Sequence, residues 1–456
     1  MRSYRSPTVR PPGCHNAAEI CYGHLMSFVC LRLTLAFVVW ALVPILSAGK
    51  MLAQANGELS RSPQGLSVDG LLASFDHPDA PGVSVAVYRA GELVYSKAVG
   101  MADLEHNIRL TSGSVFDIAS MSKQFTATAV VLLHEDRRLS IDDPIQKYLP
   151  EVHAADQKIT IRQLLQHTSG IRDYLDLMDL AGENPDNRVV SQSDVLEIIA
   201  THRHLNFKPG DAFRYENTSY ALMATLVQRV SGKSLRDFAA ERIFRPLGMN
   251  STQFRDNHTD LIRNRACGYE PREVGWSGVT PIYDEVGDGG VWTNVEDLAK
   301  WDANFYEPRV GGAQAIQLLL SQATLNNGLK MSYTLGLFVE KYRGFRMVSH
   351  GGVDPGYRAQ MLRFPDQRLT VSVLANNPAS NVEGLARQIA DVYLPKGAET
   401  VNTRPTPIPV GHDWSQFAGK YLDEATGRAR EIVSTNDGLI LRSRGRDYPL
   451  VHLEGE

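Results

Sequence analysis

The sequence predicts an α/β (α+β) fold: an antiparallel sheet flanked by helices, followed by a short C-terminal β extension. Two observations lead to this prediction. Strand-like periodicity occurs near both ends of the main segment, and helical periodicity fills the region between them. A sheet assembled from distant parts of the chain and covered by helices buries the apolar faces of both kinds of element. A chain of 456 residues is too long for a domain with one small core, so we expect one large domain with additional segments.

The first elements follow from local periodicity. Residues 81–100 alternate apolar and polar side chains around Ala90-Gly91, which predicts a β-hairpin. Residues 120–136 place apolar side chains at helical spacing. A short helix is expected over 159–166, where the turn residues His167-Thr168-Ser169-Gly170 stop it.

The second half continues with helices and then returns to strands. Residues 220–230 and 235–243 have helical periodicity, and Thr293-Asn294-Val295-Glu296 is a capping box that opens another helix. The remaining elements are strands over 345–349, 357–364 and 369–374 and a closing helix over 382–393.

The N-terminal residues 1–55 are interpreted as a signal peptide and leader. An apolar run over 33–46 follows Arg32, and residues 53–55 form an A-x-A cleavage pattern. The alternative is an uncleaved membrane anchor, although the run is shorter than the roughly 20 residues of a membrane span and contains Pro44. We therefore expect an exported protein, periplasmic or extracellular, attached to a membrane only if this segment stays uncleaved.

The C-terminal part divides into two segments. Residues 396–412 are polar and proline-rich, which is typical of a linker. Residues 413–456 contain strand-like pieces at 431–434 and 439–442, so we interpret them as a partial β-rich extension.

Ser120-Met121-Ser122-Lys123 is an S-x-x-K motif at the start of the strongest predicted helix. Three residues apart, Ser120 and Lys123 lie on the same helix face, so the amine can reach the hydroxyl. The helix N-terminus also favours negative charge developing at the serine. A serine needs an adjacent base to act as a nucleophile, and a desolvated lysine can supply one. The alternative is a helix-capping serine beside a surface lysine.

Two further motifs follow in order. Tyr215-Glu216-Asn217 is the only Y-x-N sequence in the chain, and His350-Gly351-Gly352 ends a predicted strand, with glycines that would let a ligand approach the backbone. This order resembles the superfamily of class C β-lactamases, penicillin-binding proteins and family VIII esterases. The H-x-G motif resembles the D-aminopeptidases among them. The resemblance implies a β-lactamase/transpeptidase-like catalytic domain over about residues 67–395. Secondary matches lie at 164–170, 207–222, 244–252 and 287–301.

The resemblance also implies roles for individual residues. Ser120 would be acylated, and Lys123 and Tyr215 would share proton transfer. Asn217 would bind Lys123 and the substrate carbonyl, while the backbone N–H groups of Ser120 and Val353 would form an oxyanion hole. The substrate-binding positions implied in this way are Asn217, His350, Gly351, Gly352 and Val353.

His350 stands where β-lactamases of this group usually have the lysine of Lys-Thr-Gly. A histidine is mostly neutral at pH 7, so an anionic penicillin should bind weakly. The sequence therefore predicts a serine hydrolase acting through an acyl-enzyme on small esters, D-amino-acid peptides or amides, with β-lactams less favoured. One alternative is a penicillin-binding or sensing protein that is acylated with little turnover, and another is a structural module with a degenerate site.

Other classes of function are not supported. The net charge is -4 and no Lys/Arg-rich run occurs, so we expect no nucleic-acid partner. Cys267 is the only cysteine after the leader, and His134-Glu135 lacks a second histidine four residues on, so no metal or cofactor is expected. We interpret His167 as a turn or packing residue and 287–290 as a loop near the active site. These observations do not set the oligomeric state.

Overall fold

The computed structural model describes residues 62–153, 157–396, 414–423, 428–435, 438–443 and 446–450. The chain divides into residues 1–58 and 59–456, and every described residue belongs to the second unit. The predicted signal peptide and leader, and almost all of the predicted linker, lie outside the described residues. Within the described ranges, no helix combines the length and apolarity that crossing a membrane requires.

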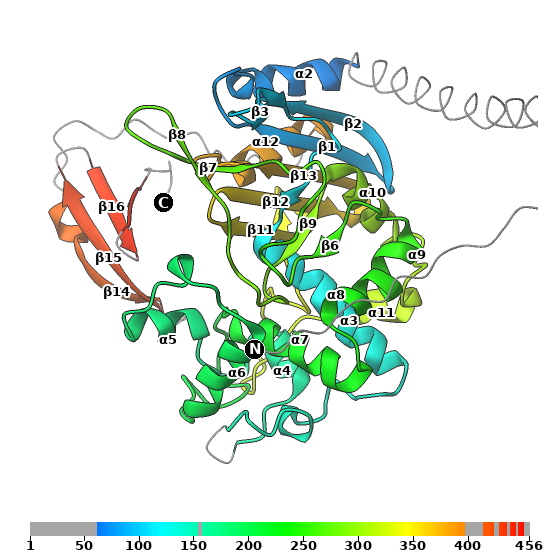
Figure 1. Cartoon of the computed structure of the whole chain (residues 1–456), viewed down its shortest axis with the longest axis vertical. Coiled ribbons are helices and arrows are strands. Elements are labelled where there is room, and N and C mark those ends of the chain that lie inside the picture. The colour runs from blue at the N-terminus through cyan, green and yellow to red at the C-terminus, as the bar shows by residue number, and fades with distance from the viewer. Residues whose placement is uncertain are drawn as a thin grey trace, which may run out of the picture. The chain divides into compact units, whose positions relative to one another are not determined.

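A six-stranded antiparallel sheet forms the centre of the fold, in the order β10-β11-β12-β13-β1-β2 (Figure 1). The strands are β1 (Val83–Arg89), β2 (Glu92–Val99), β10 (Phe338–Tyr342), β11 (Phe345–Asp354), β12 (Tyr357–Phe364) and β13 (Leu369–Ala375). β1 pairs with β13, with Val83 opposite Ala375. The prediction of a sheet built from distant parts of the chain is therefore confirmed, as is the 81–100 hairpin.

Both faces of the central strands are covered. On β1, Val83, Val85 and Val87 pack with α2 (Pro63–Leu72) and α12 (Val382–Tyr393). The alternate residues Ala86 and Tyr88 face the larger core that the other helices build. Since successive side chains of a strand point to opposite faces, β1 is buried on both sides from Val83 to Tyr88, and Ser84 is its one small polar residue in that stretch.

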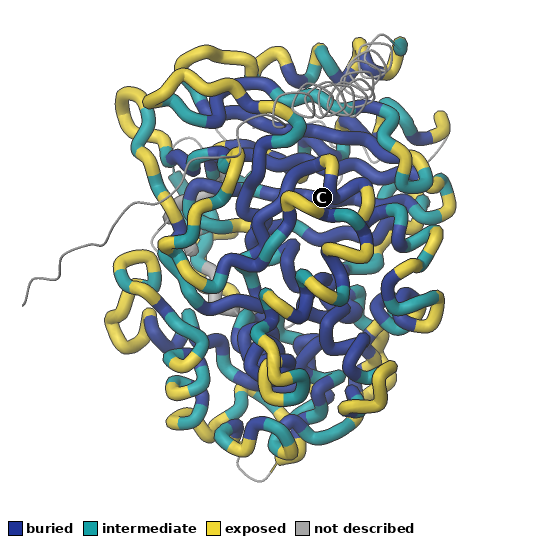
Figure 2. Tube along the Cα trace, turned by 45° about the vertical axis from the view of Figure 1, so that its right-hand side comes forward, coloured by how far each residue is buried: buried dark blue, intermediate teal, exposed yellow. Residues whose placement is uncertain are grey.

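The helix α3 (Lys123–Glu135) runs through the larger core and is buried along almost its whole length. It packs against α7 (Thr218–Ser231), and Figure 2 shows the buried segments concentrated inside the molecule with the exposed ones at its periphery. A helix enclosed on all sides carries apolar or fully bonded side chains all round. The other α-helices among the described residues are α4 (Ile161–Leu165), α5 (Tyr174–Leu180), α6 (Gln192–Thr201), α8 (Leu235–Ala239), α9 (Arg245–Leu247), α10 (Val295–Ala303) and α11 (Gly312–Leu319).

Four smaller sheets complete the described structure. They are β5-β9-β6 (Phe116–Asp117, Val291–Thr293, Gln253–Phe254), β3-β4 (Met101–Asp103, Ile108–Arg109), β7-β8 (Gly268–Pro271, Trp276–Val279) and β14-β15-β16-β17 (Gly419–Asp423, Arg428–Thr435, Gly438–Ser443, Arg446–Pro449). The C-terminal strand-like pieces predicted from the sequence are parts of β15 and β16.

The predicted capping box at Thr293 is wrong by one residue. Thr293 is the last residue of β9, where it pairs with Phe116, and its hydroxyl lies 2.6 Å from that of Thr252. The helix α10 is instead capped by Asn294, whose side chain accepts a hydrogen bond from the N–H of Asp297. Pairing in the strand therefore delays the start of the helix.

Candidate active site

Ser120 lies in a 3₁₀ helix (Ala119–Ser122) that leads into α3, rather than in the first turn of the α-helix as predicted. The preceding residue, Ala119, has a φ of 47°, in the left-handed region that a residue with a Cβ seldom adopts. The Asp117 carboxylate holds this turn by accepting a hydrogen bond of 2.8 Å from the Ala119 N–H. A local strain of this kind persists only where the surroundings impose it, which is common at functional sites.

Lys123 is fully buried, so it is not the surface lysine of the alternative interpretation. Its Nζ donates to Ser120 Oγ at 3.1 Å, to Asn217 Oδ1 at 2.9 Å and to the Asp288 carbonyl oxygen at 2.7 Å. An ammonium has three N–H donors, and these contacts use all of them. The amine is therefore held against the serine hydroxyl.

Asn217 is oriented by Asp173, a residue that the sequence did not single out. The backbone N–H and the Nδ2 of Asn217 donate to Asp173 Oδ2 at 3.0 and 3.1 Å. Asp173 also caps α5, accepting from the Leu175 N–H. Burial raises the pKa of Asp173 to about 6, and the N–H donors oppose this shift. The paired contacts leave Asn217 Oδ1 directed at Lys123.

Tyr215 lies beside the same lysine. Lys123 Nζ is 5.0 Å from the centroid of the Tyr215 ring. The Tyr215 ring also packs on aromatic neighbours, with the centroids of His167 at 4.5 Å and Tyr333 at 5.9 Å. A cation this close to the ring is attracted to its face.

His167 supports this aromatic group from within the core. The ring is buried, and its Nδ1 lies 3.3 Å from Glu216 Oε1. Burial raises the pKa of the Glu216 carboxyl to about 8, against the effect of hydrogen bonds from Ser219. His167 has a φ of 56° at its turn and packs on Tyr215 and Tyr220, so the structure places it as a turn and packing residue.

His350 lies on β11, where it is buried. Its Nδ1 is 2.6 Å from the Gly351 carbonyl oxygen, which can only accept, so Nδ1 carries the proton. Nε2 then accepts from the Tyr333 hydroxyl at 3.2 Å. Burial, reinforced by the charge of Lys123, lowers the pKa of His350 to about 3. The ring is therefore neutral at physiological pH and provides no positive charge at this position.

The two glycines after His350 differ in their surroundings. A Cβ on Gly352 would lie 2.1 Å from the Ile118 carbonyl oxygen, whereas the nearest atom to one on Gly351 would be the Gln360 side-chain oxygen at 2.7 Å. Gly352 therefore lets β11 pack against the backbone that leads into Ser120. At Gly352 the close approach is to the chain itself, and the expectation that both glycines let a ligand approach stays a prediction.

Val353 is exposed and lines the cavity above Ser120. Asp354 and Tyr357 are the paired residues that flank a two-residue hairpin turn between β11 and β12. In an antiparallel pair of strands, hydrogen-bonded and non-hydrogen-bonded residue pairs alternate, so the N–H of the next residue, Val353, points away from β12. The pairing of β10 with β11 runs from Tyr342 to Phe338, opposite Ser349, and stops short of Val353. The amide therefore faces the side of β11 that β10 does not cover.

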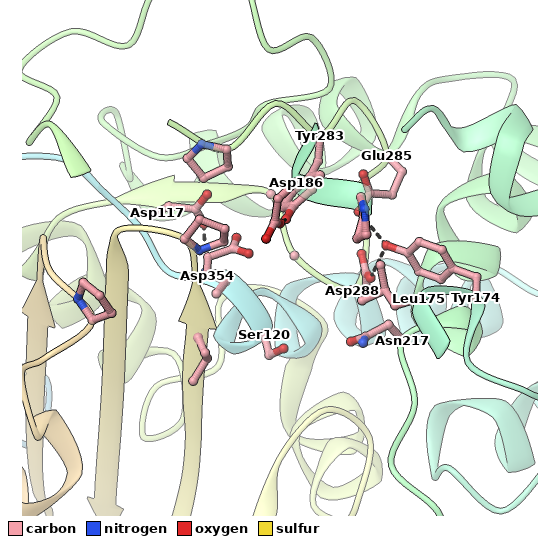
Figure 3. Close-up of a pocket in the computed structure, with 18 of the residues that line it drawn as sticks. Asp117, Ser120, Tyr174, Leu175, Asp186, Asn217, Tyr283, Glu285, Asp288 and Asp354 are labelled. Carbon is pink, nitrogen blue, oxygen red and sulfur yellow. Dashed lines mark hydrogen bonds between the residues drawn. The ribbon is translucent and has the colours of Figure 1, made fainter. Parts of the chain in front are cut away.

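These residues surround a cavity of about 1170 Å³ (Figure 3). Of the predicted site residues, those lining it are Ser120, Tyr215, Asn217, His350, Gly351 and Val353, while Gly352 packs behind the wall. The 287–290 loop contributes Asp288, whose carbonyl holds Lys123. Beyond placing the 287–290 loop near the active site, the sequence did not identify the acidic residues of the cavity. Those labelled in Figure 3 are Asp117, Asp186, Glu285, Asp288 and Asp354.

Comparison with known proteins places this site in a family. A sequence model described as Beta-lactamase matches residues 68–394. Penicillin-binding protein 4* of Bacillus subtilis (strain 168) is 28% identical over 389 residues, covering 80% of this chain and 84% of that protein. A D-aminopeptidase of Cereibacter sphaeroides is 29% identical over 366 residues, covering 79% of this chain and 67% of that protein.

Solved structures share the fold. The octameric penicillin-binding protein homologue from Pyrococcus abyssi matches with a TM-score of 0.65 and 24% identity, covering 84% of this chain and 89% of that one. The D-amino acid amidase from Ochrobactrum anthropi SV3 matches with a TM-score of 0.62 and 23% identity, covering 73% of this chain and 99% of that one.

Proposed function

The chain belongs to the beta-lactamase family of serine hydrolases, and on that premise we propose an exported enzyme that cleaves small esters or amides through an acyl-enzyme on Ser120. The observation that carries this proposal is the buried Lys123 ammonium, held 3.1 Å from Ser120 Oγ by its bonds to Asn217 and the Asp288 carbonyl. A serine hydroxyl becomes a nucleophile when a positioned partner handles its proton.

In the acylation step, Ser120 Oγ bonds to the substrate carbonyl carbon while its proton passes to the phenolate oxygen of Tyr215, whose negative charge the Lys123 ammonium offsets. Tyrosine has an ordinary pKa of about 10, so it needs a neighbouring cation to act as a base, and Lys123 lies against its ring. The carbonyl oxygen becomes an oxyanion between the N–H groups of Ser120 and Val353. The carbon–leaving-group bond then breaks, and Tyr215 returns the proton to the leaving atom.

Deacylation repeats these steps with water. A water molecule gives its proton to Tyr215 as its oxygen bonds to the acyl carbon, and the Ser120 oxygen leaves and recovers the proton. Asp173 acts as a positioning residue in both steps, because it orients Asn217 and Asn217 orients Lys123.

The substrate class follows from the relatives and from His350. The curated relatives include proteins named D-aminopeptidase, which supports D-amino-acid peptides or amides. The structural neighbour EstCE1, described as a hydrolase with promiscuous acyltransferase activity, supports a tolerance for simple acyl groups. A neutral His350 cannot pair with the carboxylate of a penicillin, so β-lactams are the least favoured class. The apolar run over 33–46 and the A-x-A pattern at 53–55 support export.

The test compares wild type with Ser120→Ala on p-nitrophenyl butyrate, D-alanine p-nitroanilide and a chromogenic cephalosporin. We expect steady turnover of the ester or the anilide by wild type and none by the variant, with unfolding curves of the two superimposable. Turnover that persists in Ser120→Ala would overturn the mechanism.

The same assay distinguishes the acylated but slow alternative. A burst of product equal in amount to the enzyme, followed by almost no further turnover, would identify a penicillin-binding or sensing protein. The mass spectrum would then show a stable adduct on Ser120. For export, the test is N-terminal sequencing of the protein recovered outside the cytoplasm. A mature chain that begins near residue 56 is expected, and retention of residues 33–46 would contradict cleavage.

A further inference from the structure

The two N–H groups of the oxyanion hole belong to segments that are far apart in the sequence. Ser120 follows β5, whereas Val353 is the last residue but one of β11. Within the described residues, no backbone hydrogen bond joins residues 117–122 to residues 350–354. The two segments touch at Gly352, where the packing leaves no room for a Cβ. Side-chain interactions therefore bear on the spacing of the two N–H groups.

Each of these segments carries an aspartate beside its N–H group. Asp117 lies three residues before Ser120 and is buried, and Asp354 directly follows Val353 and is half-buried. Figure 3 shows the two carboxyl groups next to each other in the cavity above Ser120, and they are in hydrogen-bond contact. Asp117 also accepts a hydrogen bond of 2.8 Å from the Ala119 N–H, which fixes it to the turn before the serine. The carboxyl pair thus bridges the two segments.

A pair of carboxyl groups in contact keeps one proton. Two adjacent carboxylates repel each other strongly, so they are not both ionised. Burial raises the pKa of Asp117 to about 6, against the effect of the Ala119 N–H and of a hydrogen bond from Asp354. Loss of solvent raises the pKa of Asp354 well above its usual value, and the charges of Asp117 and Asp288 add to the effect. The proton therefore belongs to Asp354, and the Asp117 carboxylate accepts from it.

The charges around the pair favour the same distribution. The titratable and charged groups that face the pair from neighbouring segments are Lys123, Asp186, Arg255, Tyr283, Glu285, Asp288 and Tyr357. Two of these groups are basic, and Lys123 is already held by Ser120, Asn217 and the Asp288 carbonyl. The Arg255 guanidinium donates to the carbonyl oxygens of Pro281 and His258. Because the three other carboxyl groups outnumber the two basic groups, a second negative charge at Asp354 is disfavoured.

A shared proton explains this pair better than a metal ion does. Two carboxyl groups do not complete a coordination sphere, because a bound metal ion takes about four or more ligands. Among the described residues, the one group of three potential ligands whose atoms lie within 4.8 Å of one another is Asp103, Glu105 and His106. That group contains neither Asp117 nor Asp354.

We propose that Asp354 is a protonated carboxylic acid whose O–H donates to the Asp117 carboxylate. This bond holds the N–H groups of Ser120 and Val353 at the spacing that the oxyanion requires. The inference rests on the proposed function and deepens it, since it names the residues that hold the oxyanion hole together. Both aspartates are positioning residues, because they act through the backbone next to them.

Two substitutions of Asp354 separate the hydrogen bond from the bulk of the side chain. Asp354→Asn keeps a donor to Asp117, because the amide N–H replaces the acid O–H, whereas Asp354→Leu keeps the size and removes the donor. For p-nitrophenyl butyrate at pH 7, we expect kcat to fall about tenfold or more in Asp354→Leu, with little change in KM. In Asp354→Asn it should stay within about threefold of wild type. A wild-type kcat in Asp354→Leu, or an equal loss in both variants, would overturn the inference.

A transition-state analogue shows whether the oxyanion hole is what changes. Butaneboronic acid forms a tetrahedral adduct when Ser120 Oγ bonds to boron, and a boron-bound oxygen then occupies the position of the oxyanion. Its inhibition constant should rise about tenfold in Asp354→Leu and stay near the wild-type value in Asp354→Asn. An inhibition constant that does not change in Asp354→Leu would contradict the positioning role.

The pH dependence of stability tests the shared proton without any turnover. A carboxyl group whose pKa is raised in the fold holds its proton more tightly there than in the unfolded chain, so the stability it contributes is lost as the pH rises toward the folded pKa. Between pH 5 and pH 7 the unfolding equilibrium constant of wild type should therefore rise relative to that of Asp354→Asn, by up to about tenfold per pH unit.

Asp366→Asn is the matched control, because Asp366 is exposed in the 3₁₀ turn after β12 and the substitution removes the same charge there. Its stability relative to wild type should hardly change over this pH range. An equally steep change in Asp366→Asn, or parallel curves for wild type and Asp354→Asn, would refute the shared proton.

These measurements also separate the inference from the proposed function. If wild type cleaves neither the ester nor the anilide while the stability curves diverge as expected, the proposed function fails and the proton pair stands. If turnover depends on Ser120 but the stability curves run parallel, the proposed function stands and the proton pair is refuted.

Discussion

Replacing Gly352 by alanine tests how closely β11 controls the catalytic serine. The new Cβ would lie 2.1 Å from the Ile118 carbonyl oxygen and 3.2 Å from the Ala119 Cβ. An ordinary carbon–oxygen contact is about 3.3 Å, so the strand and the turn must separate by about 1 Å. The turn is already constrained, because Ala119 is in the left-handed region and bonded to Asp117. The displacement therefore passes to Ser120 or to Val353.

We expect Gly352→Ala to lower both catalysis and stability strongly, although it adds only one methyl group. A misplacement of about 1 Å between reacting groups lowers catalysis by about 10²-fold, equivalent to about 2.7 kcal/mol of transition-state stabilisation. Overpacking should also lower the free energy of unfolding by about 1–3 kcal/mol. We expect kcat/KM for p-nitrophenyl butyrate to fall about 100-fold in Gly352→Ala, measured beside a denaturant unfolding curve.

Two other glycines provide the comparison. On Gly351 the new Cβ meets the far end of the flexible Gln360 side chain, which can rotate, so Gly351→Ala should lose far less activity than Gly352→Ala. Gly278 on β8 has nothing within 4 Å and serves as the neutral control. If Gly352→Ala stays within about threefold of wild type, or Gly351→Ala is equally damaging, the packing of β11 does not set the geometry of the site.

Three further predictions concern positioning, pH and stability. Asp173→Asn replaces one acceptor oxygen by a donor, so Asn217 should lose its orientation and kcat should fall about tenfold with little change in KM; an unchanged kcat would contradict the positioning role. His350 has a lowered pKa in the fold, so the unfolded chain binds more protons between about pH 6.5 and pH 3, and stability from this residue is lost as the pH falls through that window. The unfolding free energy of wild type should therefore drop relative to His350→Gln between pH 7 and pH 4.5, and parallel curves would refute the shift. Asp302→Leu leaves the buried Arg363 guanidinium without its 2.6 Å ion pair and should cost about 3–5 kcal/mol, which adding Arg363→Met should largely restore; a single variant as stable as wild type would exclude this.

The parts of the fold that the sequence predicts well depend on local periodicity. The helix expected over 382–393 is α12 to the residue, because its apolar side chains recur at i, i+3, i+4 and i+7 and nothing else competes for them. The capping box at Thr293 was predicted from the same kind of local rule, and pairing with Phe116 across the chain overrides it. Predictions from local sequence patterns fail where the residue pairs with a residue from a distant segment of the chain.

For the candidate active site too, contacts between residues close in sequence could be predicted, whereas contacts between distant residues could not. Ser120 and Lys123 are three residues apart, so their contact follows from helical geometry. Asp173 bonds Asn217 across 44 residues, and Tyr174 bonds Glu285 across 111. Nothing in the local sequence links such pairs, since a capping aspartate reads only as a helix start. The groups that position Asn217 and bring Tyr174 and Glu285 together could therefore not be predicted without the structure.

The pairing of β1 with β13 has a consequence for how the enzyme is made. Residues 83 and 375 are opposite one another in the sheet, so the sheet cannot be completed until almost the whole catalytic region has been synthesised. Contacts of such long range slow folding. Until the later segments are present, the side chains on both faces of β1 remain uncovered. A chain cut short before β11 would still contain Ser120, Lys123 and Tyr215 but would lack the strand that sets their geometry. Hydrolytic activity therefore requires the complete catalytic region. If the chain were divided into two fragments just before β10, recovery of hydrolytic activity on mixing them would measure their reassembly.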